Sequence, residues 1–209
     1  NEKMSKSLGN IITVENALTK WGGNVIRLFC YSVHYSKPLD YREDVLVEVK
    51  RSWNAIENCG WELRFAMGTH NTDKVGIISE FSRKSLEKFR MALENDLNSS
   101  VALKIFLEFV TYVNKLALSN GLSKELATIA GDTYHKIMDL LGLQLVDISE
   151  DEVKEVTALI VRRNNLRAVQ KYMESDEIRT ALFEKYSVEL TDRAGGSFWK
   201  KVEKYNSRM

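Results

Sequence analysis

The first ten residues place two lysines and two serines at a spacing that suits phosphate binding. The segment reads Lys3-Met4-Ser5-Lys6-Ser7-Leu8-Gly9-Asn10. A lysine is a point charge on a flexible stem, so it can follow phosphate groups while negative charge develops on them. We therefore expect Lys6 to contact phosphate, with Lys3 in support and the Ser5 and Ser7 hydroxyls as hydrogen-bond partners. The alternative is a polar terminus without a role, because chain ends are often poorly ordered.

A second region with binding chemistry lies near the end of the chain. The net charge of the whole chain is +1, but residues 160–209 carry 11 Lys and Arg against 7 Asp and Glu, a local net charge of +4. Such a segment suits a face that meets a polyanion. The asymmetry is mild, and alone it does not identify a partner.

Composition restricts the class of protein. A chain of 209 residues with 44% hydrophobic content can bury a core in one or two domains. Cys30 and Cys59 have no partners at metal-ligand spacing, so we expect no bound metal and two reduced core thiols in a cytoplasmic protein. The sequence has no run of 18 apolar residues and no signal peptide, which argues against a membrane or secreted protein.

Two short helices are expected before the main helical region. Thr13 can cap a helix that runs to Trp21 and ends at Gly22-Gly23. Asn24 can cap the next helix, which we expect to reach about Val33. We assign residues 1–40 to the phosphate-binding loop and these helices.

Residues 41–146 read as an antiparallel helical bundle. Asp40 and Glu43 resemble a capping box for a long helix to about Gly68, followed by a surface loop to about Ser79. Three further helices carry apolar residues at helical spacing. These are Leu86, Phe89, Leu93 and Leu97; Ile105, Phe106, Phe109, Val113 and Leu116; and Tyr134, Ile137 and Leu141.

Residues 147–209 read as a small α/β unit. Ser149 and Glu152 predict a capping box for a helix to about Tyr172, and Ser175 predicts a cap for a helix ending near Tyr186. Two short strands, 188–192 and 197–202, should flank a Gly-rich turn. The fold class is therefore mainly α with a C-terminal two-stranded hairpin.

Several motifs resemble one family. The opening segment is similar to the KMSKS loop of class I aminoacyl-tRNA synthetases. The run His34-Tyr35-Ser36-Lys37-Pro38-Leu39-Asp40-Tyr41 resembles the segment HYRxxLNY of cysteinyl-tRNA synthetases, and residues 91–99 resemble the entry to their DALR-type domain. Residues 158–199 resemble their small anticodon-recognition domain. Two departures are Ala194-Gly195-Gly196 in place of Pro-Gln-Gly, and Tyr172 where many members have Trp.

The resemblance implies an activity for an intact enzyme. Such an enzyme activates cysteine with ATP and Mg, then transfers it to tRNA-Cys, and Lys3 and Lys6 would be its catalytic loop lysines. The chain would be the C-terminal portion, without the catalytic domain that carries a His-x-Gly-His motif, and therefore inactive alone. Zinc is expected only in that catalytic domain. We expect a monomer with tRNA-Cys as its partner.

The resemblance also indicates residues that bind tRNA. The positions matching anticodon readers are Arg167, Asp176 and Asp192, with Phe198 and Trp199 available for stacking. A carboxylate can accept from an exocyclic amine, and an arginine can donate a fork to guanine. Two of these residues have a structural alternative to base recognition. Asp176 would be a carboxylate in the first turn of a helix, where it interacts with the helix dipole, and Trp199 would belong to the core.

Other charged and aromatic side chains receive weaker assignments. Three basic side chains suit a solvated helix face better than base recognition: Arg162, Arg163 and Lys171. If they bind tRNA, we expect them to contact its phosphates. His34 and Tyr35 either contact the inner corner of tRNA or serve packing.

Three alternative functions stay open at this point. The chain could be a free-standing tRNA- or RNA-binding module without catalysis, or the C-terminal region of another class I synthetase. It could also be a helical adaptor that binds protein. The intact KMSKS loop argues against the first, the segment around His34 against the second, and the matching Arg167, Asp176 and Asp192 positions against the third.

Overall fold

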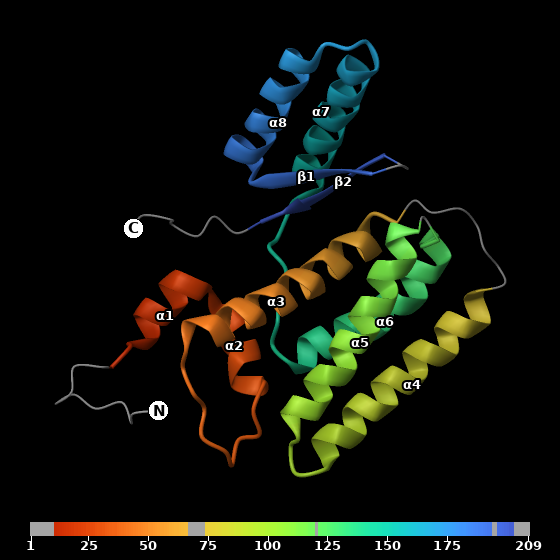
Figure 1. The fold of residues 1–209 in the computed structure, drawn as a ribbon. Helices are drawn as coiled ribbons and strands as arrows, with labels where there is room; N and C mark the ends of the chain where they lie inside the picture. The colour runs from red at the N-terminus through yellow and green to blue at the C-terminus, as the bar shows by residue number, and fades with distance from the viewer. Residues whose placement is uncertain (1–10, 67–73, 120, 194–195, 203–209) are drawn as a thin grey trace. The chain divides into compact units, whose positions relative to one another are not determined.

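The computed structural model describes residues 11–66, 74–119, 121–193 and 196–202 (Figure 1). Lys3, Ser5, Lys6 and Ser7 lie outside these residues. The described residues form eight helices and one two-stranded antiparallel hairpin, which confirms the mainly α fold. The chain divides between Gln144 and Leu145 into two compact units, a first unit up to residue 144 and a second unit of residues 145–204. Each unit is described by itself.

The first unit opens with α1 (Val14–Trp21) and α2 (Gly23–Tyr31). Thr13 caps α1 as predicted, because its hydroxyl accepts from the Asn16 N–H at 3.2 Å. The expected Asn24 cap is wrong. Gly22, at a φ of 83°, separates the helices, so Asn24 already lies in the first turn of α2.

Asn24 instead ties α2 to the end of the first unit. Its side-chain amide donates to the Gln144 carbonyl at 2.8 Å, and its side-chain oxygen accepts from the Gln144 N–H at 3.2 Å. Asn24 is buried, at 8% exposure. A partner 120 residues away has therefore replaced the local cap that the sequence suggested.

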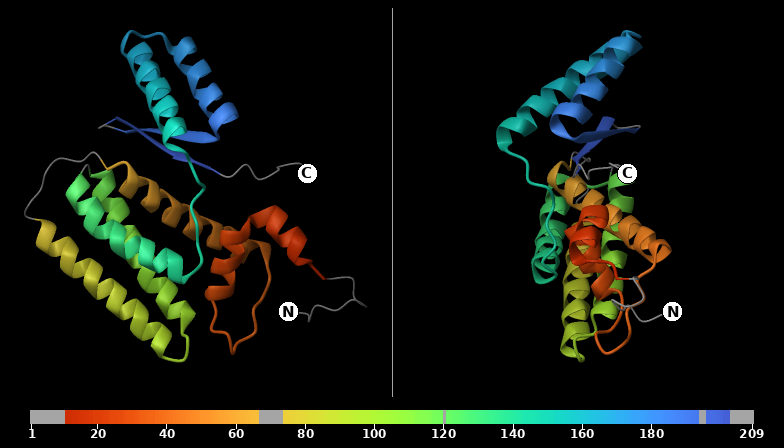
Figure 2. Two further views of the ribbon diagram at one scale, coloured as in Figure 1. Left: turned by 180° about the vertical axis from the view of Figure 1, so that it is seen from behind. Right: turned by 90° about the vertical axis from the view of Figure 1, so that its left-hand side faces the viewer.

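Four longer helices form the bundle of the first unit. They are α3 (Glu43–Arg64), α4 (Val75–Glu94), α5 (Ser99–Leu118) and α6 (Lys124–Leu140). Helices α5 and α6 each pack against both α3 and α4, as the two views of Figure 2 show. The expected Asp40–Glu43 capping box is wrong, since Arg42 is the N-cap without a side-chain bond, and Asp40 pairs with the Arg42 Nε at 3.2 Å.

Aromatic side chains fill the bundle core. Phe106, Phe109 and Tyr134 have no exposed surface, and the Tyr134 hydroxyl donates to the Ile56 carbonyl at 2.9 Å. The stripes predicted for α5 and α6 are therefore largely buried, as expected.

The face of α4 differs from its prediction. Leu86 and Leu93 are only half-buried, and Leu97 is 65% exposed because it follows the end of the helix with a φ of 49°. Small side chains complete the buried stripe of α4, where close packing against two neighbouring helices favours them. The buried residues are Ile78, Ser82, Ser85, Phe89 and Ala92.

The second unit consists of α7 (Glu150–Ala168), α8 (Tyr172–Tyr186), β1 (Val188–Arg193) and β2 (Gly196–Lys201). The capping box at the start of α7 is confirmed, with both Ser149 and Glu152 bonds at 3.2 Å. The expected end of α7 near Tyr172 is wrong, because the chain turns at Gln170, whose φ is 61°. Ser175 does not cap α8 but is buried inside it.

The hairpin presents two different faces. Leu190 pairs with Trp199 and Asp192 pairs with Ser197, so these side chains share the face that meets the helices. Thr191 and Phe198 pair on the opposite face. The face toward the helices carries the buried side chains of Val188, Leu190 and Trp199.

The Asn24 tie generates a prediction for stability. Replacing Asn24 by Ala removes both bonds to Gln144 and should lower the free energy of unfolding by roughly 1–3 kcal/mol. The measurement is urea unfolding followed by tryptophan fluorescence, since Trp21, Trp53 and Trp61 all report on the first unit. Thr19→Ala is the control, because the exposed Thr19 hydroxyl donates to the Glu15 carbonyl within its own helix. Identical midpoints for Asn24→Ala and wild type would contradict the assignment.

Candidate functional site

An ion pair between a buried arginine and a partly exposed carboxylate joins α7 to the hairpin. The two terminal nitrogens of Arg163 lie 2.8 Å from the two carboxylate oxygens of Asp192, which is a bidentate arrangement. The Arg163 side chain has no exposed surface, whereas that of Asp192 is 42% exposed. The expectation of a solvated Arg163 at phosphate is therefore wrong. The signal that could have found it is the stripe of Val156, Ile160 and Arg163, spaced for one helix face.

Two polar neighbours complete the surroundings of this carboxylate. The Ser197 hydroxyl lies 3.0 Å from the Asp192 Oδ1 and 3.0 Å from the Asn164 Oδ1, so it can donate to one of them at a time. The Asn164 Oδ1 also accepts from Arg163 at 3.2 Å. The carboxylate is therefore held from both α7 and β2.

The charges of the pair shift both pKa values. Hydrogen bonds from Arg163 lower the pKa of Asp192 to about 2, against the opposing effect of burial and with help from Ser197. The pKa of Arg163 is raised, first by its hydrogen bonds to Asp192, and the charge of Asp176 also contributes. Asp192 is therefore an ionised acceptor at neutral pH.

One exposed side chain of α7, that of Arg167, approaches Asp192, and it also lies near a ring of α8. The Arg167 guanidinium is 41% exposed, approaches the Asp192 Oδ2 at 4.0 Å, and lies 5.9 Å from the ring of Tyr172. Arg163 and Arg167 share one face of α7, and Tyr172 and Asp176 share one face of α8, because each pair is four residues apart. We call Arg167, Tyr172, Asp176 and Asp192 the Asp192 cluster.

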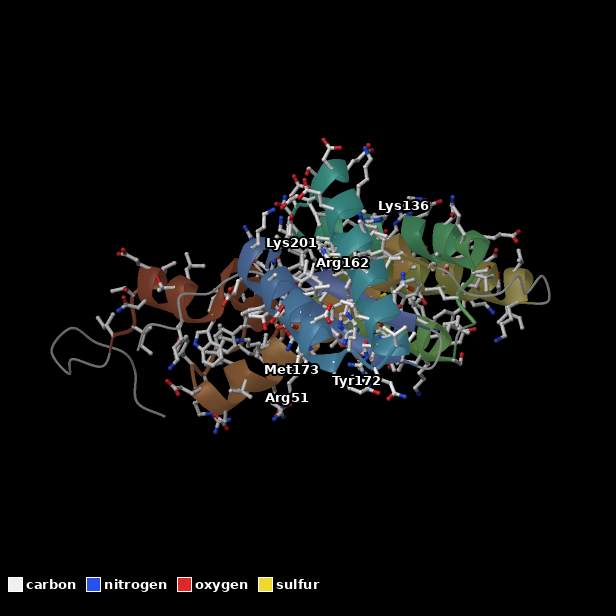
Figure 3. All side chains as sticks on the ribbon, turned by 90° about the horizontal axis from the view of Figure 1, so that it is seen from above. Arg51, Lys136, Arg162, Tyr172, Met173 and Lys201 are labelled. Atoms are coloured by element: carbon white, nitrogen blue, oxygen red, sulfur yellow. The ribbon has the colours of Figure 1, made fainter. Side chains whose placement is uncertain are left out.

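Tyr172 is the residue that sequence reasoning left out of the site. It is 54% exposed and stands at the start of α8, followed by Met173, which is 83% exposed (Figure 3). The signal was present, since Tyr172 replaces an aromatic residue of the similar family. The predicted helix from Ser149 to Tyr172 concealed it, because that boundary was four residues too late.

Neither aromatic residue of β2 belongs to the Asp192 cluster, for two different reasons. Trp199 is 7% exposed and packs on the helix-facing side of the hairpin, as the core alternative requires. Phe198 lies on the opposite side, where the Arg193 guanidinium stands 4.3 Å from its ring. Strand alternation therefore places Phe198 and Asp192 on opposite faces of the hairpin.

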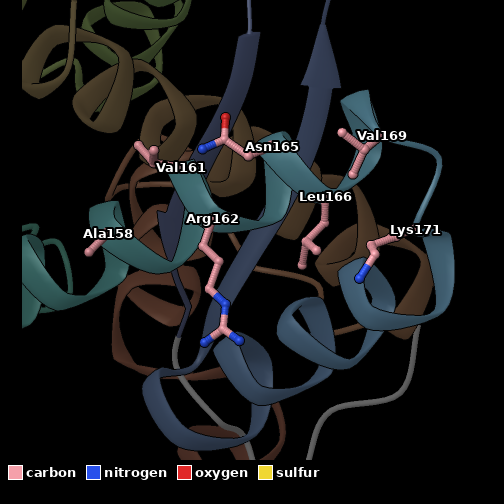
Figure 4. A pocket seen from close by; sticks show the side chains of 7 residues that line it. All are labelled: Ala158, Val161, Arg162, Asn165, Leu166, Val169 and Lys171. Atoms are coloured by element: carbon pink, nitrogen blue, oxygen red, sulfur yellow. The ribbon is translucent and has the colours of Figure 1, made fainter.

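Arg162 and Lys171 border an open groove along α7 (Figure 4). Both side chains belong to exposed residues, and Lys171 pairs with Glu174 at 2.8 Å. The floor is apolar, with exposed Val161 and Val169. The other lining residues are Ala158, Asn165 and Leu166.

His34 and Tyr35 have a structural contact in the first unit. The Tyr35 hydroxyl donates to an Asp96 carboxylate oxygen at 2.7 Å, and the His34 Nε2 lies 3.0 Å from the Asp96 carbonyl. The bond to Asp96 raises the pKa of Tyr35. These contacts join the segment after α2 to the turn between α4 and α5, which favours the packing role.

The remaining chemistry of the described residues is limited. Cys59 is buried as expected, but Cys30 is exposed, so its assignment to the core is wrong. The described ranges contain no group of three His, Cys, Asp or Glu side chains placed to bind a metal ion. Within the same ranges, no helix combines the length and apolar character needed to cross a membrane.

Comparison with known proteins gives two family matches. A model described as "tRNA synthetases class I (C) catalytic domain" matches residues 1–51, and one described as "DALR domain" matches residues 88–146. The second match covers the end of α4 and the whole of α5 and α6.

Relatives with the printed name cysteine–tRNA ligase match nearly the whole chain. The protein from Caldicellulosiruptor saccharolyticus is 34% identical over 87% of this chain and 40% of its own length. The protein from Staphylococcus saprophyticus is 33% identical over 96% of this chain and 44% of its own. The protein from Exiguobacterium is 29% identical over 97% and 44%. The chain thus spans less than half the length of these relatives.

The shifted pKa of Asp192 predicts a pH dependence of stability. Asp192→Asn should lower the free energy of unfolding by roughly 1–3 kcal/mol at pH 7, because hydrogen bonds to an ionised group are lost. A lowered folded-state pKa stabilises above the unfolded value, near 3.8, and this contribution is lost as the pH falls toward 2.

The measurement is urea unfolding of wild type and variant between pH 2 and pH 7. The stability difference should be constant above pH about 5 and shrink below pH about 4. Glu189→Gln, on the opposite face of the hairpin, should change stability less. A difference that stays constant down to pH 2 would contradict the assignment.

Proposed function

Since the chain is homologous to cysteine–tRNA ligases over 87–97% of its length, we propose that it is the tRNA-binding portion of such an enzyme. The observation that carries this proposal is the Asp192 cluster, in which an ionised carboxylate, an exposed arginine and an exposed tyrosine lie on neighbouring elements. Single-stranded RNA is recognised through stacking and through hydrogen bonds to base edges, and this cluster offers both.

Each member of the cluster suits one part of an unpaired anticodon base. The Asp192 and Asp176 carboxylates can accept from exocyclic amines, and Arg167 can donate a fork to a guanine edge. Tyr172 offers a ring for stacking, extended by the Arg167 guanidinium. We assign stacking to Tyr172 and not to Trp199, whose ring is buried. Phe198 lies on the other hairpin face and would have to meet a different nucleotide.

Arg162 and Lys171 are proposed to contact phosphate. They border the same α7 surface and their residues are exposed, which suits sequence-independent attraction to the backbone. Arg163 is removed from this group because its charge is already paired inside the unit.

The remaining proposals concern the whole enzyme. It would use ATP with Mg and cysteine, with Lys3, Ser5, Lys6 and Ser7 closing on the phosphates, and it would transfer cysteine to tRNA-Cys in the cytoplasm as a monomer. This chain alone is proposed to be inactive. Zinc is proposed for the catalytic domain of the whole enzyme, as the family resemblance implies. The described residues contain no group of three His, Cys, Asp or Glu side chains placed to bind it.

Binding to anticodon variants tests the proposed function. The full chain should bind a tRNA-Cys transcript better than transcripts with one changed anticodon base, at one stated salt concentration. Asp176→Asn should reduce discrimination at one base by roughly 1–3 kcal/mol, because an amide cannot replace both carboxylate oxygens as acceptors.

Glu177→Gln is the matched control, since Glu177 is the next exposed carboxylate of α8. Equal losses in both variants, spread over all transcripts, would assign Asp176 a general electrostatic role. Equal wild-type affinity for every transcript would remove the anticodon function from this chain.

The loop lysine is tested separately in the intact enzyme. Lys6→Ala should slow ATP–pyrophosphate exchange by roughly 100-fold or more, because charge at the developing pyrophosphate is lost. The dissociation constant for tRNA should stay unchanged. Lys20→Ala removes a lysine of α1 that pairs with Glu43 and serves as the control. A parallel loss of exchange and of tRNA affinity would show that Lys6 binds tRNA.

A further inference from the structure

We propose that Arg163 is a positioning residue for base recognition, holding the Asp192 carboxylate in the orientation that leaves one oxygen open to a base amine. This inference rests on the proposed function and adds a specificity-determining residue to it. Arg163 itself has no exposed surface and therefore touches no RNA. It acts through the group that it holds.

The hydrogen bonds around Asp192 show which oxygen is open. A carboxylate oxygen offers two acceptor positions. Oδ1 accepts from Arg163 at 2.8 Å and lies 3.0 Å from the Ser197 hydroxyl. Oδ2 accepts from Arg163 at 2.8 Å, and the next donor among the described residues, Arg167, stands at 4.0 Å. Oδ2 therefore keeps one acceptor position that no donor of the described residues fills, in a side chain that is 42% exposed.

The fork geometry of arginine explains why this residue type is needed. Two parallel N–H bonds fix both the position and the plane of the carboxylate, whereas a lysine would fix only a distance. The Arg163 Nε is buried and makes no hydrogen bond within the described residues. Leaving Nε buried without a partner is unfavourable. The terminal nitrogens, by contrast, bond Asp192 and its neighbours Asn164 and Ser197.

Stability alone gives a weak reason for a buried ion pair. Removing two charges from water opposes their attraction, and apolar residues of similar volume often stabilise as well. The same unit contains a second tie between α7 and the hairpin, where Lys201 lies 3.0 Å and 3.1 Å from the carboxylate oxygens of Glu152. That pair joins the open end of the hairpin, far along the register from Asp192. It provides a control pair between the same elements that makes no contact with Asp192.

The experiment compares affinities of the full chain for four transcripts. These are tRNA-Cys and three versions with one anticodon base changed each, at one salt concentration. Asp192→Asn first identifies the base that Asp192 reads. Arg163→Lys keeps the charge and should lose at least about fivefold of the discrimination at that same base, while the other two bases are unaffected.

Two further variants separate positioning from folding. Ser197→Ala removes a neutral hydroxyl without burying a charge, and it should cause a smaller loss at the same base. Lys201→Met should lower the urea midpoint without changing discrimination at any base.

The outcomes are distinguishable. Full discrimination in Arg163→Lys, with loss in Asp192→Asn, would overturn the positioning role and leave the proposed function standing. Losses in Arg163→Lys that are equal at all bases and matched by Lys201→Met would make Arg163 structural and also overturn it. A wild-type chain that binds all four transcripts equally would overturn the proposed function and this inference together.

Discussion

The arrangement of the candidate site depends on one interaction, the bidentate ion pair between Arg163 and Asp192. It is the contact at which α7, β1 and β2 meet, because Ser197 and Asn164 bond the same carboxylate–guanidinium group. A unit of about 60 residues buries little apolar surface, so directional contacts matter more in it than in a large domain. Burying the Arg163 charge is unfavourable. The ion pair nevertheless occurs at a position where its other member, Asp192, lies partly at the surface.

The pair also decides which side chains share a surface. The helical period places Arg167 one turn beyond Arg163, and Asp176 one turn beyond Tyr172. The period of the strands brings Asp192 to the helices and sends Phe198 away from them. The Arg163–Asp192 contact therefore lies beneath a surface to which α7, α8 and β1 each contribute side chains. Residues that are neighbours in the sequence of a strand, by contrast, lie on opposite faces of the hairpin.

The sequence predicted local features well. Thr13, the Ser149–Glu152 capping box and both strands depend on residues within a few positions of each other, and the structure has them as expected. Distant partners caused the errors. Asn24 could have capped a helix, but Gln144, from the other end of the first unit, holds its side chain.

The same reason explains the errors in the candidate site. Arg163 was grouped with Arg162 because adjacent arginines look alike in a sequence, and only packing against β1 makes one buried and the other exposed. Tyr172 was missed because nothing local marked the turn at Gln170, whose backbone is left-handed without a glycine. The loop lysines remain a prediction, because they lie outside the described residues.

The tie between Asn24 and Gln144 has a consequence for binding by the whole chain. It fixes the last residue of the first unit, and Ser149 caps α7 only a few residues later. The connection between the units is therefore a short tether with both ends anchored. For an RNA that contacts both units, attachment to one raises the effective concentration of the other. The contact with one base would then form in a complex that the other unit already holds. A weak preference for that base would not have to sustain binding by itself.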